Sequence, residues 1–201
     1  GKIKKLVGSE FLKLKGTWIF WIHLGVPVAG AGLFLLYGVA AKREWQSVLE
    51  FYAETLAIVY PSVSAIICMQ SVMQELKAGN FQNLLCVSTL RWSATLRKIL
   101  TLWILGLAAS LLAFLLFGMG VWGTKAAWNL SVKEYLICGL ILWITQAGIY
   151  LLHFFLAMRF GSGACLAAGV TQSLIAALLF TGLGDGLWMW FPCGWSGHLL
   201  L

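Results

Sequence analysis

Uncharged runs of about twenty residues alternate with short charged segments along this chain. The hydrocarbon core of a bilayer is about 30 Å thick, and a helix crosses it with about 20 apolar residues. Membrane strands would instead show alternating segments of about ten residues. The pattern therefore predicts an all-α membrane protein, a polytopic helical bundle in a single transmembrane domain over residues 1–201. The five expected spans are about 17–41, 55–74, 99–124, 135–158 and 161–184.

Composition narrows the class of protein. Of the 201 residues, 61% are hydrophobic and 10% are charged, whereas soluble domains are about half apolar and about a quarter charged. This excludes an ordinary cytosolic enzyme, a disordered chain and a nucleic-acid module. The formal net charge of +7 then needs an explanation from membrane topology.

The basic residues gather on one side of the expected bundle. Cytoplasmic loops of membrane proteins carry an excess of Lys and Arg. Ten basic residues fall in the N-terminal tail and in the loops after spans two and four, against four on the other side. The ten are Lys2, Lys4, Lys5, Lys13, Lys15, Lys77, Arg91, Arg97, Lys98 and Arg159; the four are Lys42, Arg43, Lys125 and Lys133. We therefore expect a cytoplasmic N-terminus and an outward-facing Asp185, with no need for a nucleic-acid partner.

The last residues, 185–201, read as an interfacial segment on the outer face. Trp188, Trp190 and Trp195 are typical of the membrane–water interface, and Pro192 would interrupt a long helix. The segment is expected to be interfacial or re-entrant and to lead into a sixth span that is missing. A frayed apolar tail fits the composition equally well. Both ends look trimmed, since the chain begins with Gly1 and stops within an apolar run.

The cytoplasmic loop of residues 75–98 is longer than any other between the spans. It has a break at Gly79 and Asn80, after which Phe81, Leu84 and Leu85 recur at helical spacing. Such an amphipathic segment lies along the membrane surface or presents its apolar face to a soluble partner. A surface helix that only anchors the loop is the alternative, and composition leaves both open.

Three strings of residues are recognisable. The main string covers this loop and holds Gln74-Glu75, Ala78-Gly79-Asn80-Phe81-Gln82-Asn83-Leu84-Leu85, Arg91 and Arg97-Lys98-Ile99-Leu100. Two supporting strings lie near the ends: Ser9 to Trp18 with Trp21, His23 and Pro27, and Gly184-Asp185-Gly186-Leu187-Trp188 with Pro192. With these strings the chain resembles permease subunits of lantibiotic-immunity ABC transporters.

The resemblance implies a membrane subunit of the type-two ABC exporter class, with six spans in the complete form. Two identical or homologous permeases would pair in the bacterial cell membrane above a separate ATPase, which would bind ATP and Mg. No cofactor is expected in this chain itself. The cargo would be a lantibiotic-type peptide expelled to give self-immunity, and residues 4–15 would form an amphipathic elbow helix. The residues implied to contact the ATPase, in a coupling helix, are Glu75, Gly79, Asn80, Phe81, Gln82, Leu84, Leu85 and Arg91.

Nothing in the sequence points to catalysis. ATP hydrolysis needs a G-x-x-x-x-G-K-[ST] loop, and the nearest match, Gly118 to Lys125, has its Thr and Lys in the wrong order. The five cysteines are scattered without a C-x-x-C pair, which argues against disulfides and zinc. We therefore expect a transport subunit and no metal or catalytic site.

Two histidines within the spans supply an alternative function. At 1.5 Å per residue, His23 and His153 both lie about 9 Å inside the cytoplasmic boundary, so they could face each other as ligands of haem in a membrane anchor subunit. Neutral, hydrogen-bonded packing histidines are the simpler interpretation. A membrane scaffold without transport activity is a third possibility.

Overall fold

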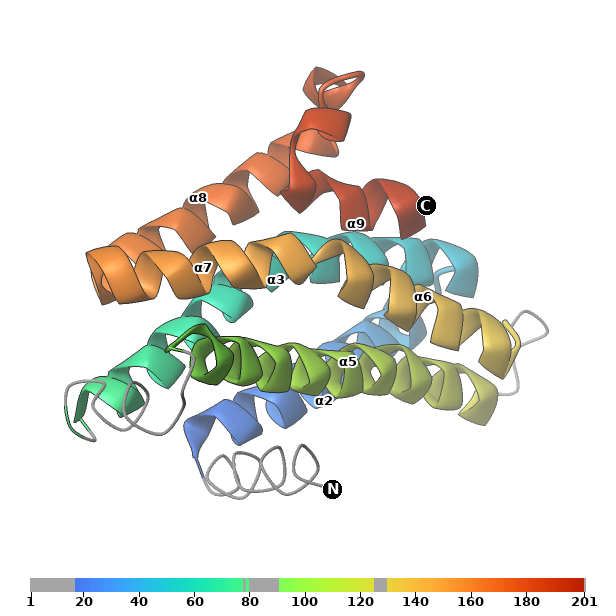
Figure 1. Ribbon diagram of the computed structural model, residues 1–201. Helices are drawn as coiled ribbons and strands as arrows, with labels where there is room; N and C mark the ends of the chain where they lie inside the picture. Colours follow the sequence, from blue (N-terminus) through green and yellow to red (C-terminus); the bar gives the residue numbers. More distant parts are fainter. Residues whose placement is uncertain (1–16, 78, 80–90, 125–129, 201) are drawn as a thin grey trace.

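The computed structural model describes residues 17–77, 79, 91–124 and 130–200 (Figure 1), and every regular element among them is helical. The long helices are α2 (Trp18–Ala41), α3 (Trp45–Lys77), α5 (Arg91–Gly123), α6 (Val132–Thr145), α7 (Ala147–Phe160) and α8 (Ser162–Leu179). Two short 3₁₀ helices, η1 (Gly182–Gly184) and η2 (Trp188–Trp190), precede α9 (Pro192–Leu200).

Helix α3 lies at the centre of the bundle. It packs against α2, α5, α7, α8 and α9, while α5 fills the space between α2 and α6. Small side chains allow this crowding, because Ala57, Ser64, Ala65 and Ser71 of α3 are all fully buried. Three apolar clusters result among the described residues, one of which includes Tyr52. Its ring stacks on Phe117 with centroids 5.0 Å apart.

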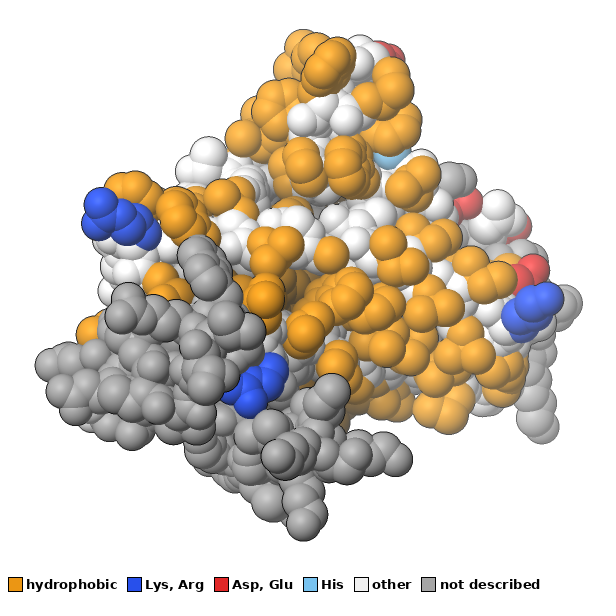
Figure 2. Space-filling view, in the orientation of Figure 1, with side chains coloured by type: hydrophobic (Ala, Val, Ile, Leu, Met, Phe, Trp, Pro, Cys, Tyr) orange, Lys and Arg blue, Asp and Glu red, His pale blue; other side chains and the backbone are white. Residues whose placement is uncertain are grey.

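The outward faces of the helices are apolar as well. Figure 2 shows hydrophobic side chains over much of the described surface on the visible side, with the charged side chains at its left and right edges, at the top and beside the grey atoms. Within the part of the chain that the structure describes, five helices are long and apolar enough to cross a membrane: Trp18–Ala41, Trp45–Lys77, Thr95–Gly123, Val132–Phe160 and Ser162–Leu179. The predicted all-α polytopic fold with five visible spans is therefore confirmed.

The helix boundaries differ from the sequence prediction because charges end an apolar run without ending a helix. The second span was expected to begin at residue 55, yet α3 begins at Trp45 and carries Glu50 on its surface. The amide of Gln46 donates to the Glu50 carboxylate at 3.1 Å, one turn further along. Likewise α5 begins at Arg91, eight residues before the expected start of span three at Ile99.

The fourth span is broken at Gln146, which the sequence did not predict. Helix α6 begins with a capping box formed by Ser131 and Glu134 and ends at Thr145. The Gln146 N–H donates to the Trp143 carbonyl at 3.3 Å, so the hydrogen bonding tightens before α7 begins. The Gln146 side chain donates to the Ser196 hydroxyl at 3.0 Å. This bond joins the break to α9.

The fifth span ends at Leu179, five residues before the expected end at 184. The chain then turns at the tip of α8 and comes back, so that α9 packs against α3, α6 and α8 (Figure 1). Cys193, Gly194, Ser196 and Gly197 of α9 are buried. Residues 192–200 thus form a short helix that folds back against the bundle. The expected elbow helix, residues 4–15, lies outside the described residues.

Candidate functional site

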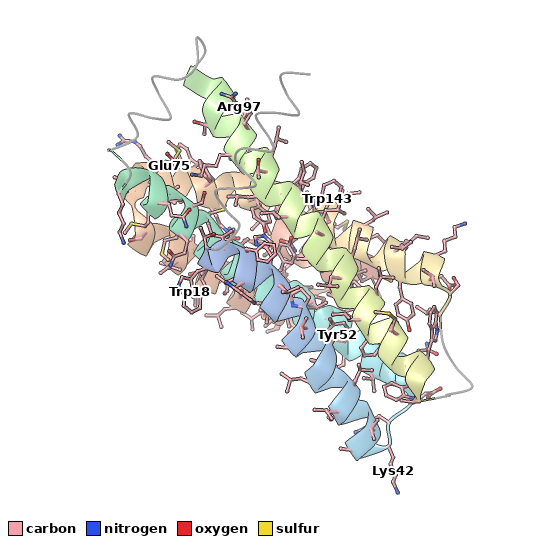
Figure 3. All side chains as sticks on the ribbon, turned by 90° about the horizontal axis from the view of Figure 1, so that it is seen from below. Trp18, Lys42, Tyr52, Glu75, Arg97 and Trp143 are labelled. Atoms are coloured by element: carbon pink, nitrogen blue, oxygen red, sulfur yellow. The ribbon has the colours of Figure 1, made fainter. Side chains whose placement is uncertain are left out.

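The loop implied to contact an ATPase is flanked by α3 and α5, and the two helices meet at its base. The Lys98 ammonium of α5 forms an ion pair with the Glu75 carboxylate of α3. Figure 3 shows Glu75 and Arg97 at the same end of the molecule, far from Lys42. The base of the loop is therefore fixed by a salt bridge between residues that are 23 positions apart in the sequence.

This ion pair is largely removed from water. The side chains of Lys98 and Glu75 are 8% and 16% exposed, respectively. A buried charge is expensive unless it is paired, and removing one partner leaves the other uncompensated. The end of α3 and the start of α5 are thus held together, and a force on the loop would reach both helices.

Of the residues implied to contact the ATPase, the structure describes three. Glu75 lies in the last turn of α3, and Arg91 is the first residue of α5, although its side chain is outside the described part. Gly79 has φ 131°, a conformation that L side chains rarely adopt. Helix α3 ends at Lys77, two residues before this glycine. The remaining five residues, Asn80, Phe81, Gln82, Leu84 and Leu85, lie outside the described residues.

Sequence reasoning placed Lys98 in the recognised loop string and in the count of basic residues, but it did not predict that Lys98 pairs with Glu75. The sequence does hold a signal for this pairing: the Glu75 carboxylate follows one apolar run, and the Lys98 cation precedes the next. Other basic residues share this end of the bundle, where α3 and α7 finish and α5 and α8 begin (Figure 1). Lys77 and Arg159 are exposed there, whereas Lys42 and Arg43 are exposed at the opposite end.

The two histidines suggested as haem ligands lie in different surroundings. The His23 Nδ1–H donates to the Ile19 carbonyl at 2.7 Å within α2. His153 of α7 pairs through Nδ1 with the Ser64 hydroxyl of α3 at 2.8 Å. Because that hydroxyl donates to the Pro61 carbonyl, the His153 ring is the donor to Ser64. Both rings are buried and hydrogen-bonded, as the packing interpretation expects.

A shared haem site receives no support from these contacts. His23 lines a cavity between α2, α3 and α5, and His153 is not among the lining residues. Within the described ranges no group of three or more His, Cys, Asp or Glu side chains is placed to hold a metal ion.

Comparison with known proteins gives the family. The family model described as "ABC-2 family transporter protein" matches residues 6–184. This chain belongs to the ABC-2 transporter family. It is a multi-pass membrane protein and a permease subunit of an ABC exporter, which is a transport component and not a catalytic one. Membership implies an ABC ATPase partner and a dimeric permease. No curated protein and no solved structure gives a significant match.

Proposed function

We propose that this ABC-2 permease expels a lantibiotic-type peptide from the bacterial cell membrane, driven by a separate ATPase that docks on residues 75–98. The N-terminus and this loop face the cytoplasm. The buried Glu75–Lys98 pair at the base of the loop carries the proposal. It ties α3 to α5, so that a push on the loop displaces two of the central helices together.

The transmission path follows from the packing. Helix α3 contacts α2, α7, α8 and α9, and α5 contacts α2 and α6. Because packed interiors move as units, a shift of the α3–α5 pair is passed to the remaining spans. ATP-driven closure of the partner would thereby alternate the permease between two conformations.

The docking step is tested by placing a charge on the apolar face of the loop. In Phe81→Asp and Leu84→Asp the chain should insert normally into the membrane but fail to retain its ABC ATPase partner in a pull-down. Asn83→Asp adds the same charge at a polar position and serves as the control. Unchanged retention of the ATPase by both apolar-face variants would reject the coupling role.

The cargo is tested separately, in a lantibiotic-sensitive bacterium that expresses this chain with its ABC ATPase partner and, where the permeases differ, the second permease. We expect tolerance of the lantibiotic to rise, and the rise to be lost when the ATPase cannot hydrolyse ATP. If the ATPase is retained in the pull-down but tolerance does not change for any lantibiotic tested, then the coupling proposal stands and the cargo proposal is wrong.

A further inference from the structure

Two of the apolar clusters are stacked along the length of the bundle. The loop-side cluster joins the halves of α2, α3 and α5 nearest the 75–98 loop to α7 and the start of α8, and it includes Ile19 and Leu102. The far cluster joins the other halves of α2, α3 and α5 to α6, and it includes Tyr52 and Phe117. Three helices therefore run through both clusters, whereas α7 belongs to the loop-side half of the bundle and α6 to the far half.

A half-open apolar cleft lies where the two clusters meet. Its lining takes Ile67 and Tyr150 from the loop-side cluster, and Ala113 and Leu142 from the far cluster. Its volume of about 50 Å³ exceeds the share of about 30 Å³ that one water molecule takes in the liquid, and voids of that size are few in a packed interior. Packing is therefore interrupted at this level of the bundle.

Four of the spans each contain a residue that weakens a helix. Proline has no N–H and removes one hydrogen bond from a helix interior, as Pro27 does in α2 and Pro61 in α3. Gly106 lies within α5, where glycine is less favourable than alanine. The span formed by α6 and α7 is interrupted at Gln146. Each of these residues marks a point at which its span bends more easily.

The contacts of these residues place them at the level of the cleft. An added Cβ on Gly106 would lie 3.0 Å from the Tyr60 hydroxyl oxygen and 3.2 Å from that of Tyr150. Tyr60 directly precedes the proline of α3, and Tyr150 lies one turn beyond the break between α6 and α7. Pro27 lines the same cleft as both tyrosines. The four weak points therefore lie together, where the two clusters meet.

Hydrogen bonds from neighbouring helices hold α3 and the break at this level. The Ser62 N–H of α3 donates to the Ser173 hydroxyl of α8 at 3.2 Å, and the Gln146 Nε2 donates to the Ser196 hydroxyl of α9 at 3.0 Å. No partner for the Gln146 Oε1 occurs among the described residues, although the atom is buried. A buried acceptor without a donor is costly. That cost falls on the present conformation and makes a second conformation easier to reach.

We infer that the bundle pivots at this level when the permease changes state, the loop-side half turning against the far half about Pro27, Pro61, Gly106 and Gln146. The fourth span is divided accordingly, since α7 packs on α3 and α8 while α6 packs on α5 and α9 (Figure 1). Closely packed parts move as units about a few residues that absorb the change in angle. A push on the loop then becomes a turn between the halves. The inference rests on the proposed coupling of the loop to the ATPase and not on the proposed cargo.

Four exposed positions report on this movement. Leu96 of α5 and Phe160 of α7 belong to the loop-side half, and Val39 of α2 and Val132 of α6 belong to the far half. Each is replaced by cysteine, two at a time, in a cysteine-free chain. The chain is spin-labelled, diluted with unlabelled chain and assembled in lipid nanodiscs with its ABC ATPase partner. Double electron–electron resonance then gives the distances without nucleotide and after trapping with ATP and vanadate.

Distances that join the two halves should shift on trapping, and distances within one half should not. A turn of about 15° over the 14 residues of α7, or about 21 Å, corresponds to a shift of about 5 Å. The complex is first shown to hydrolyse ATP faster than the ATPase alone, which separates docking of the ATPase from the pivot. Distances between the halves that stay fixed in such a complex, or distances within one half that change as much, would overturn the inference.

Two variants remove weak points one at a time. Pro61→Ala restores a backbone N–H to α3, and Gln146→Leu removes the unpaired acceptor. Each should reduce the shift between the halves at least twofold without lowering the melting temperature, whereas loss of a merely structural contact would lower the melting temperature and leave the shift intact. Thr145→Val deletes a hydroxyl that bonds to carbonyl groups of its own helix and should change neither. A shift that survives in full in both variants would contradict the pivot.

Discussion

Trp103 of α5 and Trp143 of α6 hold each other by a reciprocal pair of hydrogen bonds. The Trp143 indole N–H donates to the Trp103 carbonyl at 2.7 Å, and the Trp103 indole N–H donates to the Trp143 carbonyl at 3.4 Å. Their rings stack with centroids 4.0 Å apart and planes inclined by 18°. Since Trp143 lies three residues before the helix break at Gln146, the pair ties that break to α5.

Replacing Trp143 should separate the hydrogen bond from the stacking. Trp143→Phe keeps an aromatic ring but loses the donor, and should lower the free energy of unfolding by about 1 kcal/mol. Trp143→Ala also loses the ring contact and should cost about 3 kcal/mol. Circular dichroism during denaturant unfolding in detergent measures both. Trp122→Phe is the control at a half-exposed tryptophan of α5; an equal loss there would contradict a specific role for the pair.

Breaking the ion pair at the base of the loop should destabilise the bundle. Glu75→Gln leaves the Lys98 ammonium buried without its counter-charge, and we expect a loss of about 2 kcal/mol, less than for a fully buried pair. The charge swap, Glu75→Lys with Lys98→Glu, should recover part of this loss, because attraction is restored in the opposite sense. Unfolding in detergent measures the free energy of unfolding of each variant. The rate of ATP hydrolysis by the partner ATPase measures how well each variant remains coupled to it.

If the charge swap were as unstable as Glu75→Gln, attraction between the two side chains would not be what stabilises this end of the bundle. That result would contradict the role given to the Glu75–Lys98 ion pair. A matched control is Lys77→Gln, which removes a charge from an exposed position of the same helix end. That variant should change the stability by less than about 0.5 kcal/mol.

The sequence predicted the five spans because lipid selects for long apolar runs, a signal that survives without any tertiary information. It did not predict the helix ends, since α3 and α5 continue into charged segments at Trp45 and Arg91. Helical hydrogen bonding continues beyond the apolar run, and local side-chain hydrogen bonds such as the one from Gln46 to Glu50 support it.

The break at Gln146 could not be predicted, because its cause is a contact between residues 50 positions apart. The Gln146 amide is held by Ser196 of α9, and no proline or glycine marks the position itself. The candidate ATPase-coupling site also contains a contact between distant residues that the sequence could not predict. Glu75 and Lys98 both stand in the loop signature, whereas their pairing became visible only when α3 and α5 were brought side by side.

Close contact between α3 and α8 depends on a single glycine. A Cβ on Gly169 would lie 2.4 Å from the Ala65 Cβ and 3.1 Å from the Pro61 carbonyl oxygen. Gly169→Ala should therefore force the helices apart and cost about 2 kcal/mol of stability, as overpacking does. Gly163→Ala on the same helix has nothing within 4 Å of the new methyl group and should be neutral. Thermal unfolding of both variants in detergent makes the comparison; equal melting temperatures would show that the contact relaxes freely.

Orientation in the membrane has a direct test in cysteine labelling of intact cells. Basic residues at the loop end, including Arg97 and Arg159, favour a cytoplasmic location for that end. In a chain whose other cysteines are replaced by serine, Cys86 should react with an impermeant maleimide only after the membrane is opened. A second chain carries Arg43→Cys as its one cysteine, at the exposed opposite end. This cysteine should react in intact cells. Reaction of Cys86 in intact cells, with Arg43→Cys protected, would place the loop outside, where no ATPase could reach it.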